Sequence, residues 1–156
     1  MDFKVELIIV SQLLVSFVLG AFIGFDRERH GRDAGIRTYA AVCIGATLFT
    51  AVANHLTGDV AAASRVIANI ITGVGFLGAG IIYRNNSAGT SHGLTTAATI
   101  WCTAAVGVAI GLKMFIIAVV GSLALYFLLS LHHQRWYKKW KQKIINEHNA
   151  SAKHEQ

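Results

Sequence analysis

The chain has 156 residues, of which 54% are hydrophobic and only 14% are charged. Soluble domains usually carry about 25% charged residues. The charges are also clustered, because no carboxylate occurs between Asp59 and Glu147. A surface facing water cannot be built from that distribution. The composition therefore predicts an integral membrane protein and, by its length, a single domain.

Five charge-free runs predict transmembrane helices at Leu7–Phe25, Tyr39–Asn54, Val66–Tyr83, Leu94–Ile110 and Met114–Leu131. A helix perpendicular to the bilayer needs about 20 residues, with about 17 as the lower limit. The second run reaches that limit only with Thr38 or His55 added. The expected fold class is all-α, a polytopic membrane protein with five transmembrane helices in a domain of residues 1–133.

The distribution of Lys and Arg predicts the orientation. With the N-terminus outside, eleven of the fourteen lie in cytoplasmic segments and three, Lys4, Arg65 and Lys113, lie outside. Basic residues favour the cytoplasmic side of a membrane, so this split predicts an N-out/C-in topology. The same bias accounts for the net charge of +6, and no nucleic-acid partner is expected.

Residues 134–156 are expected to form a basic juxtamembrane helix and tail. Trp136, Trp140 and Ile144 recur there at helical spacing, with lysines between them. That pattern is typical of a short interfacial helix whose lysines contact anionic lipid headgroups. A solvated basic tail is the alternative interpretation.

The third run contains four glycines, Gly73, Gly75, Gly78 and Gly80. Glycines in lipid-embedded helices let other helices approach closely. We expect this run to be the central helix, with its glycines packed inside the same chain. A homodimer seam is one alternative, and a helix broken at residues 73–80, as in some transporters, is another. The GxGxxG spacing lacks the acidic residue that a dinucleotide site requires.

The outer half of the same run carries a polar stripe formed by Arg65, Asn69 and Thr72. Arg65 is expected to make a salt bridge, with Asp59 as its nearest acidic neighbour in the sequence, or to contact a lipid headgroup. Lining a water-filled vestibule is the alternative. Glycine pairs at the same close-packing spacing occur at Gly20/Gly24 and Gly107/Gly111.

A polar cluster is predicted where four helix ends meet on the cytoplasmic side. Its members are Asp26, Arg27, Glu28, Arg37, Thr38, Arg84, Thr95 and Thr96, and Ser91 is a candidate cap for the fourth helix. The opposed charges are expected to hold the helices together. The alternative is a small-ion or headgroup site, with Asp26 and Glu28 as candidate ligands for Mg²⁺.

Several features weigh against a cofactor and against catalysis. Arg27, Arg29, Arg32 and Arg37 share the loop with those two acids, which disfavours a strong cation site. No cofactor apart from Mg²⁺ is therefore expected. The sequence carries no hydrolytic, redox or nucleotide-binding motif, so we do not expect an enzyme.

Four blocks identify a family resemblance: GAFIGFDRE from Gly20, GIRT from Gly35, RVIANIITGVGFLGAGI from Arg65 and GLTTAATIW from Gly93. Together they resemble the MgtC/SapB family of bacterial inner-membrane proteins, over roughly residues 7–112. The positions that match the family's motifs are Gly24, Arg27, Glu28, Arg37, Thr38, Arg65, Gly73, Gly75, Gly78, Gly80, Thr95, Thr96 and Trp101.

The resemblance implies a five-span protein of the bacterial inner membrane with a cytoplasmic C-terminus. The family is associated with growth under magnesium limitation and, in pathogens, with virulence through survival inside host cells. Some members restrain other membrane machines, including the proton-driven ATP synthase. Longer members carry a soluble domain after the last span, and this chain resembles the short SapB type.

We therefore expect a non-enzymatic modulator of magnesium or ion homeostasis. It would act through helix packing, as a homodimer or with another membrane protein complex. The competing hypothesis is a transporter or channel for Mg²⁺ or a small solute.

Overall fold

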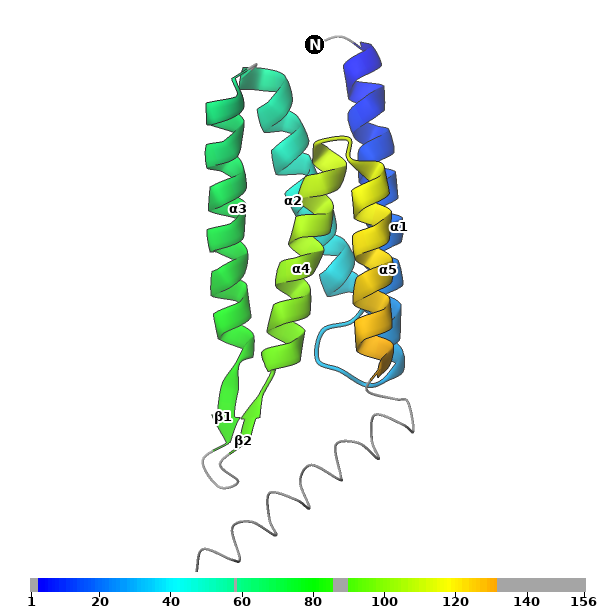
Figure 1. Ribbon diagram of the computed structural model, residues 1–156, viewed down its shortest axis with the longest axis vertical. Coiled ribbons are helices and arrows are strands. Elements are labelled where there is room, and N and C mark those ends of the chain that lie inside the picture. Colours follow the sequence, from blue (N-terminus) through cyan, green and yellow to red (C-terminus); the bar gives the residue numbers. More distant parts are fainter. Residues whose placement is uncertain (1–2, 58, 86–89, 132–156) are drawn as a thin grey trace, which may run out of the picture.

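The computed structural model describes residues 3–57, 59–85 and 90–131, which fold as a bundle of helices with one short hairpin (Figure 1). In chain order the elements are α1 (Phe3–Arg29), α2 (Ile36–Thr57), α3 (Val60–Ile81), β1 (Tyr83–Asn85), β2 (Thr90–His92), α4 (Leu94–Gly111) and α5 (Phe115–Leu131). The two strands pair antiparallel, with Tyr83 opposite His92. The predicted interfacial helix at residues 134–156 lies outside the described residues.

Within the described ranges, α1 to α4 are each long and apolar enough to cross a membrane. Helix α5 has 17 residues, which equals the lower limit of about 17 for a span. The prediction of an all-α polytopic membrane protein is confirmed. The assignment of α5 as the fifth span stays a prediction that its length permits.

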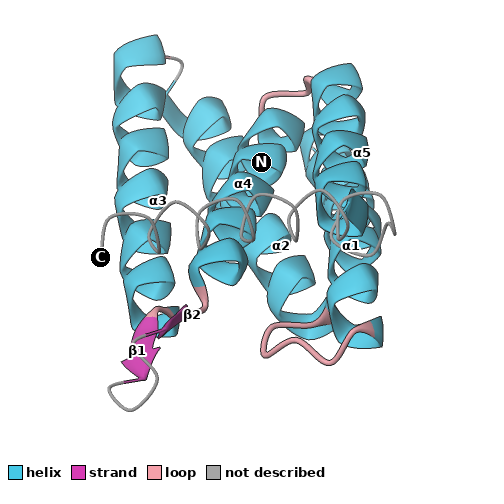
Figure 2. Ribbon diagram, turned by 60° about the horizontal axis from the view of Figure 1, so that its bottom comes forward, coloured by secondary structure: helices cyan, strands magenta, loops and turns pink. Residues whose placement is uncertain are grey.

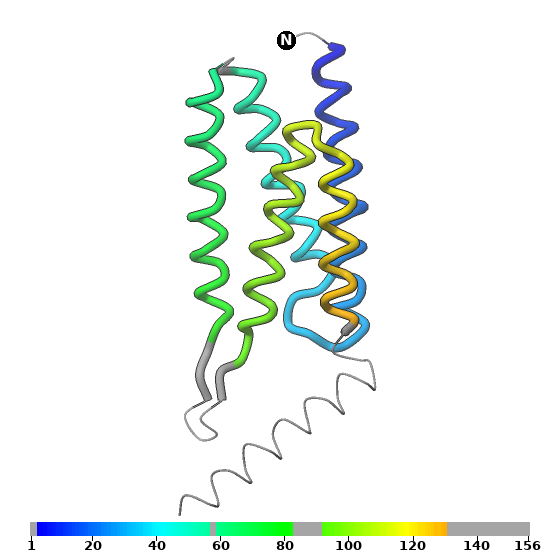
Figure 3. The backbone as a smooth tube through the Cα atoms, in the orientation of Figure 1, coloured from blue at the N-terminus to red at the C-terminus, as the bar shows by residue number. Residues whose placement is uncertain are grey.

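The bundle has two distinct ends. The loop between α1 and α2 lies at the same end as the β1–β2 hairpin, and we call this the hairpin end (Figures 1 and 3). The connections between α2 and α3 and between α4 and α5 lie at the opposite end. Arg65, near the start of α3, and Lys113, just after α4, belong to that opposite end. The segregation expected from the basic residues is therefore present, and which end faces the cytoplasm stays a prediction.

Helix α4, and not α3, is the centre of the bundle. It packs against each of the other four helices, whereas α3 packs mainly against α4 and α2 at the edge (Figure 2). In the most apolar 18-residue window of each helix, 61% of α4 is buried but only 11% of α3. The prediction that the Val66–Tyr83 run forms the central helix is wrong.

The glycines show the same difference between the centre and the edge: those of α1 and α4 touch another helix, and most of those in α3 do not. A Cβ atom built on Gly20 would lie 2.8 Å from the Ala40 Cα atom, and one on Gly24 would lie 2.7 Å from the Ile36 Cα atom. The helices α1 and α2 therefore touch backbone to backbone at these two glycines. Two glycines of α4, Gly107 and Gly111, make equally close contacts with α2.

Three of the four α3 glycines make no close contact with another helix of the chain. Gly73, Gly75 and Gly80 have no heavy atom of another residue within 4 Å of a built Cβ, and Gly78 alone approaches α4, at 3.5 Å from Ala97. The expected packing role inside the chain is therefore wrong for three of these four residues. Helix α3 also runs without a break from Val60 to Ile81, so the broken-helix alternative is wrong as well.

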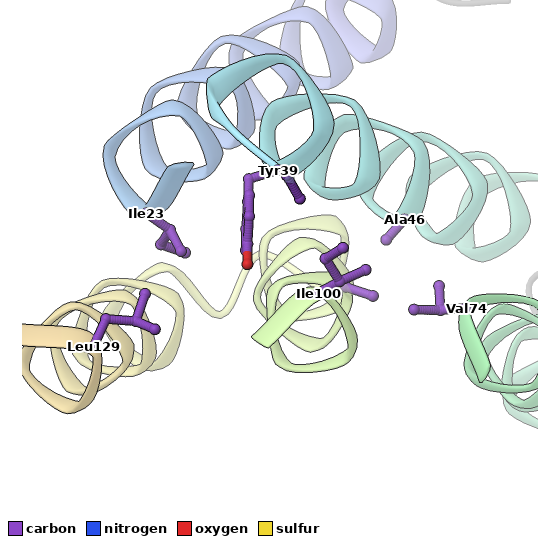
Figure 4. Close-up of a cluster of buried hydrophobic side chains, with 8 residues drawn as sticks. Ile23, Tyr39, Ala46, Val74, Ile100 and Leu129 are labelled. Atoms are coloured by element: carbon purple, nitrogen blue, oxygen red, sulfur yellow. The ribbon is translucent and has the colours of Figure 1, made fainter. Parts of the chain in front are cut away.

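The apolar core lies between α1, α2, α4 and α5, and α3 contributes Val74 to it. Tyr39 and Ile23 are fully buried, and Ile100 of α4 is 1% exposed. Figure 4 shows the Tyr39 ring between α1 and α4, close to Ile23 and Ile100. This arrangement carries the Tyr39 hydroxyl into the interior, where it needs a hydrogen-bonding partner.

Candidate functional site

The candidate site is built where the C-terminal turn of α1, the start of α2 and the start of α4 meet at the hairpin end. Asp26 and Arg27, in the last turns of α1, are each only 6% exposed. Charged residues are almost never buried this far without a partner. The partners of these two side chains therefore define what the site can do.

Arg27 connects α1 to α4. Its Nη2 atom donates a hydrogen bond of 2.7 Å to the Thr96 hydroxyl, in the first turn of α4. Its Nε atom is buried and has no hydrogen-bonding partner. The guanidinium has no described carboxylate within ion-pairing distance either. A buried cation is thus held by one neutral hydroxyl, and its donor capacity is left partly unused.

Asp26 and Glu28 have separate local partners. His30 lies one turn after Asp26, and its Nδ1 atom is 3.5 Å from the Asp26 carboxylate and 2.6 Å from the Asp26 carbonyl oxygen. The exposed Glu28 carboxylate accepts a 2.9 Å hydrogen bond from the Ile36 backbone N–H. Glu28 therefore serves the first turn of α2, whose leading N–H groups lack partners within the helix. A Cβ on Gly35 would lie 2.6 Å from that carboxylate.

This geometry does not favour the predicted Mg²⁺ pair. Residues two positions apart on a helix point to different sides, so Asp26 and Glu28 do not converge on one ion. In the described ranges, no group of three or more His, Cys, Asp or Glu side chains is placed to hold a metal. Mg²⁺ binding at these two residues stays a prediction without a supporting contact.

The start of α4 differs from the expectation. Its N-cap residue is Gly93, with φ of 84°, and no side chain caps the helix. The predicted cap, Ser91, lies in β2 instead. Gly93 occupies a left-handed conformation that side chains rarely adopt, and a Cβ there would clash with the Ile81 carbonyl oxygen. The positive end of the α4 dipole therefore lies beside Arg27, and its cap residue supplies no side-chain acceptor.

The other predicted members of the cluster lie apart from this contact. Arg37 and Thr38 are exposed, and so is Thr95. Arg84 lies in β1 at the same end, although its side chain is outside the described parts. The predicted network of opposed charges between helices is wrong for Arg37. The observed links between helices are the bonds from Arg27 to Thr96 and from Ile36 to Glu28.

Apart from Thr96, sequence reasoning missed a line of polar residues inside the bundle, which we call the polar seam. Its members are Gln12 and Ser16 of α1, Tyr39 and Thr47 of α2, and Thr96, Thr99 and Thr103 of α4, all buried. Thr96, Thr99 and Thr103 are spaced three and four residues apart, which places them on one helix face. That spacing was the available signal in the sequence.

Hydrogen bonds join the polar seam across helices. The hydroxyls of Tyr39 and Thr99 lie 2.6 Å apart, and Thr47 donates to the Gly107 carbonyl oxygen at 2.9 Å. At the opposite end, the Gln12 amide donates to the carbonyl oxygens of Ile110 and Gly111, at 2.6 and 3.1 Å. Unsatisfied polar groups are costly in hydrocarbon, so these bonds fasten α1 and α2 to α4.

The polar stripe of α3 stays at the surface. Arg65, Asn69 and Thr72 are all exposed. Asp59, the expected partner of Arg65, is the N-cap residue of α3, and its carboxylate accepts a 2.9 Å bond from the Ala61 N–H. Asn69 borders a groove between α2 and α3, together with Gly45, Phe49, Val66 and Gly73. Trp101, on α4, is 48% exposed.

Apolar helices with an internally hydrogen-bonded polar seam, and charges confined to the two ends, define a multi-pass membrane protein. Comparison with known sequences identifies the family. The chain belongs to the MgtC family, whose sequence model matches residues 13–136.

Three relatives show the range of similarity. Protein SrpB of Synechococcus elongatus is 36% identical over 149 residues, covering 86% of this chain and 82% of SrpB. Protein MgtC of Brucella abortus is 47% identical over 96 residues, covering 62% of this chain and 39% of that protein. The putative magnesium transporter YhiD of Escherichia coli K12 is 38% identical over 138 residues, covering 83% of this chain and 62% of YhiD.

The chain thus spans most of SrpB but less than two thirds of the other two relatives. No solved structure matches the chain.

Proposed function

We propose that this protein is a bacterial inner-membrane protein of magnesium homeostasis that acts without catalysis, by associating with a second copy of itself through α3. Membership of the MgtC family and the similarity to YhiD, a putative magnesium transporter, support the magnesium connection. The single observation that carries the association is the exposed stripe of α3 that contains Asn69, Gly73 and Gly80, which lie on one side of the helix.

Helix α3 carries glycines of the kind found where two helices pack closely, but at three of them no other helix of the chain is in contact. Glycines weaken helices, by about 1 kcal/mol each relative to alanine, and they are useful in lipid mainly where another helix comes close. Gly73, Gly75 and Gly80 have no such neighbour inside the chain. Gly45 of α2, across the groove from Gly73, is equally open.

A second copy is the occupant that fits this face best. A two-fold interface must be complementary to itself. The Asn69 amide carries both donors and an acceptor, so it can pair with the partner's Asn69. Within the described residues the Asn69 side chain has no hydrogen bond, and the Thr72 hydroxyl bonds to its own helix at the Ala68 carbonyl. Pairing across the interface would satisfy a polar group that otherwise faces hydrocarbon.

The test is the oligomeric state of the full chain in liposomes, measured by single-molecule photobleaching at low protein-to-lipid ratio. We expect dimers for the unmodified chain and monomers for Gly73→Leu, because a bulky side chain between Asn69 and Gly80 keeps the two α3 helices apart. A matched control is Val120→Leu, on the exposed face of α5, which should remain dimeric. Monomers of the unmodified chain, or unchanged dimers of Gly73→Leu, would refute the proposal.

One observation supports the transport hypothesis. The polar seam extends through the bundle from Thr96, which bonds to Arg27, to Gln12. Its hydroxyls and amide are, however, bonded largely to backbone carbonyls, and Gly20, Gly107 and Gly111 bring the surrounding helices into direct contact. We therefore place transport second. Mg²⁺ flux into liposomes containing the purified chain, reduced by Thr103→Val, would reverse that order.

A further inference from the structure

The Arg27 guanidinium is the most unusual group in the bundle. It is 6% exposed, it bears a fixed positive charge, and it uses one bond to a neutral hydroxyl. Its buried Nε–H has no partner. Arginine side chains buried in proteins are normally paired with an anion, often through two parallel bonds. Within the described residues no such anion is supplied by the protein.

The position of Arg27 makes this deficit larger. Thr96, which accepts its hydrogen bond, lies in the first turn of α4, at the positive end of that helix. Gly93 provides no side-chain cap, so the leading N–H groups of α4 receive no acceptor from their cap residue. A cation next to a helix N-terminus is unfavourable by itself. A guanidinium and a helix N-terminus that face one anion together are favourable, and this combination suits a phosphate group.

The neighbouring acids do not fill this role. Asp26 lies beside His30, and Glu28 accepts the N–H of Ile36. Arg29, the last residue of α1, is exposed, and so are Arg32 and Asp33 in the loop that follows. The hairpin end therefore presents two further cations near Arg27, while two of its three acids already have local partners.

We infer that Arg27 and the N-terminal turn of α4 form a binding site for a phosphate group, supplied either by a soluble phosphate compound or by the headgroup of an anionic lipid. The anion would accept from the unused donors of Arg27 and from the leading N–H groups of α4. One bound anion would then link α1 to α4, and α4 follows directly from the hairpin. The inference is independent of the proposed dimer, because the site lies within one chain.

The experiment compares two probes on the full chain. The first is inorganic pyrophosphate, added to delipidated protein in detergent and followed by isothermal titration calorimetry at constant ionic strength. The second is a series of nanodiscs containing 0–30% phosphatidylglycerol or cardiolipin, with bound lipid counted by native mass spectrometry. Binding of pyrophosphate alone indicates a soluble ligand, whereas retention of anionic lipid alone indicates a headgroup. Either result supports the site.

Variants separate a binding site from a structural arginine. Arg27→Lys keeps the charge but loses the planar fork, and we expect binding of the preferred probe to fall at least tenfold. Thr96→Val removes the hydrogen bond that positions the guanidinium but leaves the guanidinium itself, so binding should weaken less than in Arg27→Lys. Arg29→Lys, the same charge-conserving change on the exposed surface, is the matched control and should change binding less than threefold.

Two outcomes would overturn the inference. One is that neither probe binds the unmodified chain better than chloride or phosphatidylcholine does. The other is that Arg27→Lys and Arg29→Lys weaken binding equally, which would indicate a diffuse basic surface. Circular dichroism of each variant shows whether it is folded, and Arg27→Lys is the conservative change least prone to unfold the bundle.

Discussion

Replacing Gly20 by alanine should destabilise the bundle, whereas the same change at Gly73 should not. At Gly20 the added Cβ would lie 2.8 Å from the Ala40 Cα and 2.9 Å from the Tyr39 carbonyl oxygen, both backbone atoms of α2. Ordinary contacts begin at 3.4 Å, so α1 and α2 must separate by about 0.6 Å. Overpacking of this kind costs about 1–3 kcal/mol. At Gly73 the Cβ meets open space, and alanine should leave stability unchanged or raise it by up to about 1 kcal/mol.

The assay is the free energy of unfolding of the full chain in mixed micelles, titrated with sodium dodecyl sulfate and followed by circular dichroism. Dilute conditions keep the chain monomeric, so that a contact between two copies through α3 does not contribute. We expect Gly20→Ala to fall below Gly73→Ala by at least about 1 kcal/mol. Equal stabilities, or a greater loss for Gly73→Ala, would refute the close contact between α1 and α2 and the placement of α3 at the edge.

Three further predictions concern the polar seam and the loop. Gln12→Leu should lower the free energy of unfolding by about 0.6–1.7 kcal/mol, because two backbone carbonyls at the end of α4 lose their donor; an unchanged titration would contradict that role. Tyr39→Phe and Thr99→Val should show a coupling energy of at least about 0.5 kcal/mol in a double-mutant cycle, since their hydroxyls lie 2.6 Å apart; strict additivity would count against the bond. The effects of Arg37→Glu and Glu28→Lys on the free energy of unfolding should be additive within about 0.5 kcal/mol, because Arg37 is exposed and the Glu28 carboxylate accepts the Ile36 N–H. Rescue of one charge reversal by the other would instead support the predicted charge network.

The sequence predicted the helices and the two charged ends because both depend on the solvent. Hydrocarbon excludes charges and leaves the backbone little choice but to form helices, so charge-free runs mark spans directly. The start of α3 was placed six residues late, at Val66, because the uncharged segment before it is interrupted by Arg65. Its true start at Val60 follows the Asp59 cap.

The sequence did not reveal which face of each helix is buried. In water an apolar stripe marks the inner face, but in lipid the outer face is apolar as well. Gly75 in α3 and Gly107 in α4 therefore look alike in the sequence, although one is open and the other touches α2. Helix rotation, which hydropathy does not encode, separates the two cases.

The sequence predicted only part of the candidate site, again because it does not encode the rotation of each helix. Arg27 and Thr96 were both placed in the cluster, and the structure brings them to 2.7 Å. Arg37 was placed there too, yet it points outward. Gly93 was matched only as part of a family block. Its left-handed conformation, which leaves α4 uncapped, is a property of the turn from β2 into the helix.

Cysteine cross-linking along α3 in native membranes tests the central claim most directly, since that claim is that α3 turns its glycine face outward toward a second copy. In a chain with Cys43 and Cys102 replaced by alanine, Gly73→Cys should form a disulfide between two chains under mild oxidation. Val74→Cys, at a position that is 9% exposed and faces the bundle, should not. Cross-linking from Val74→Cys and not from Gly73→Cys would contradict the account.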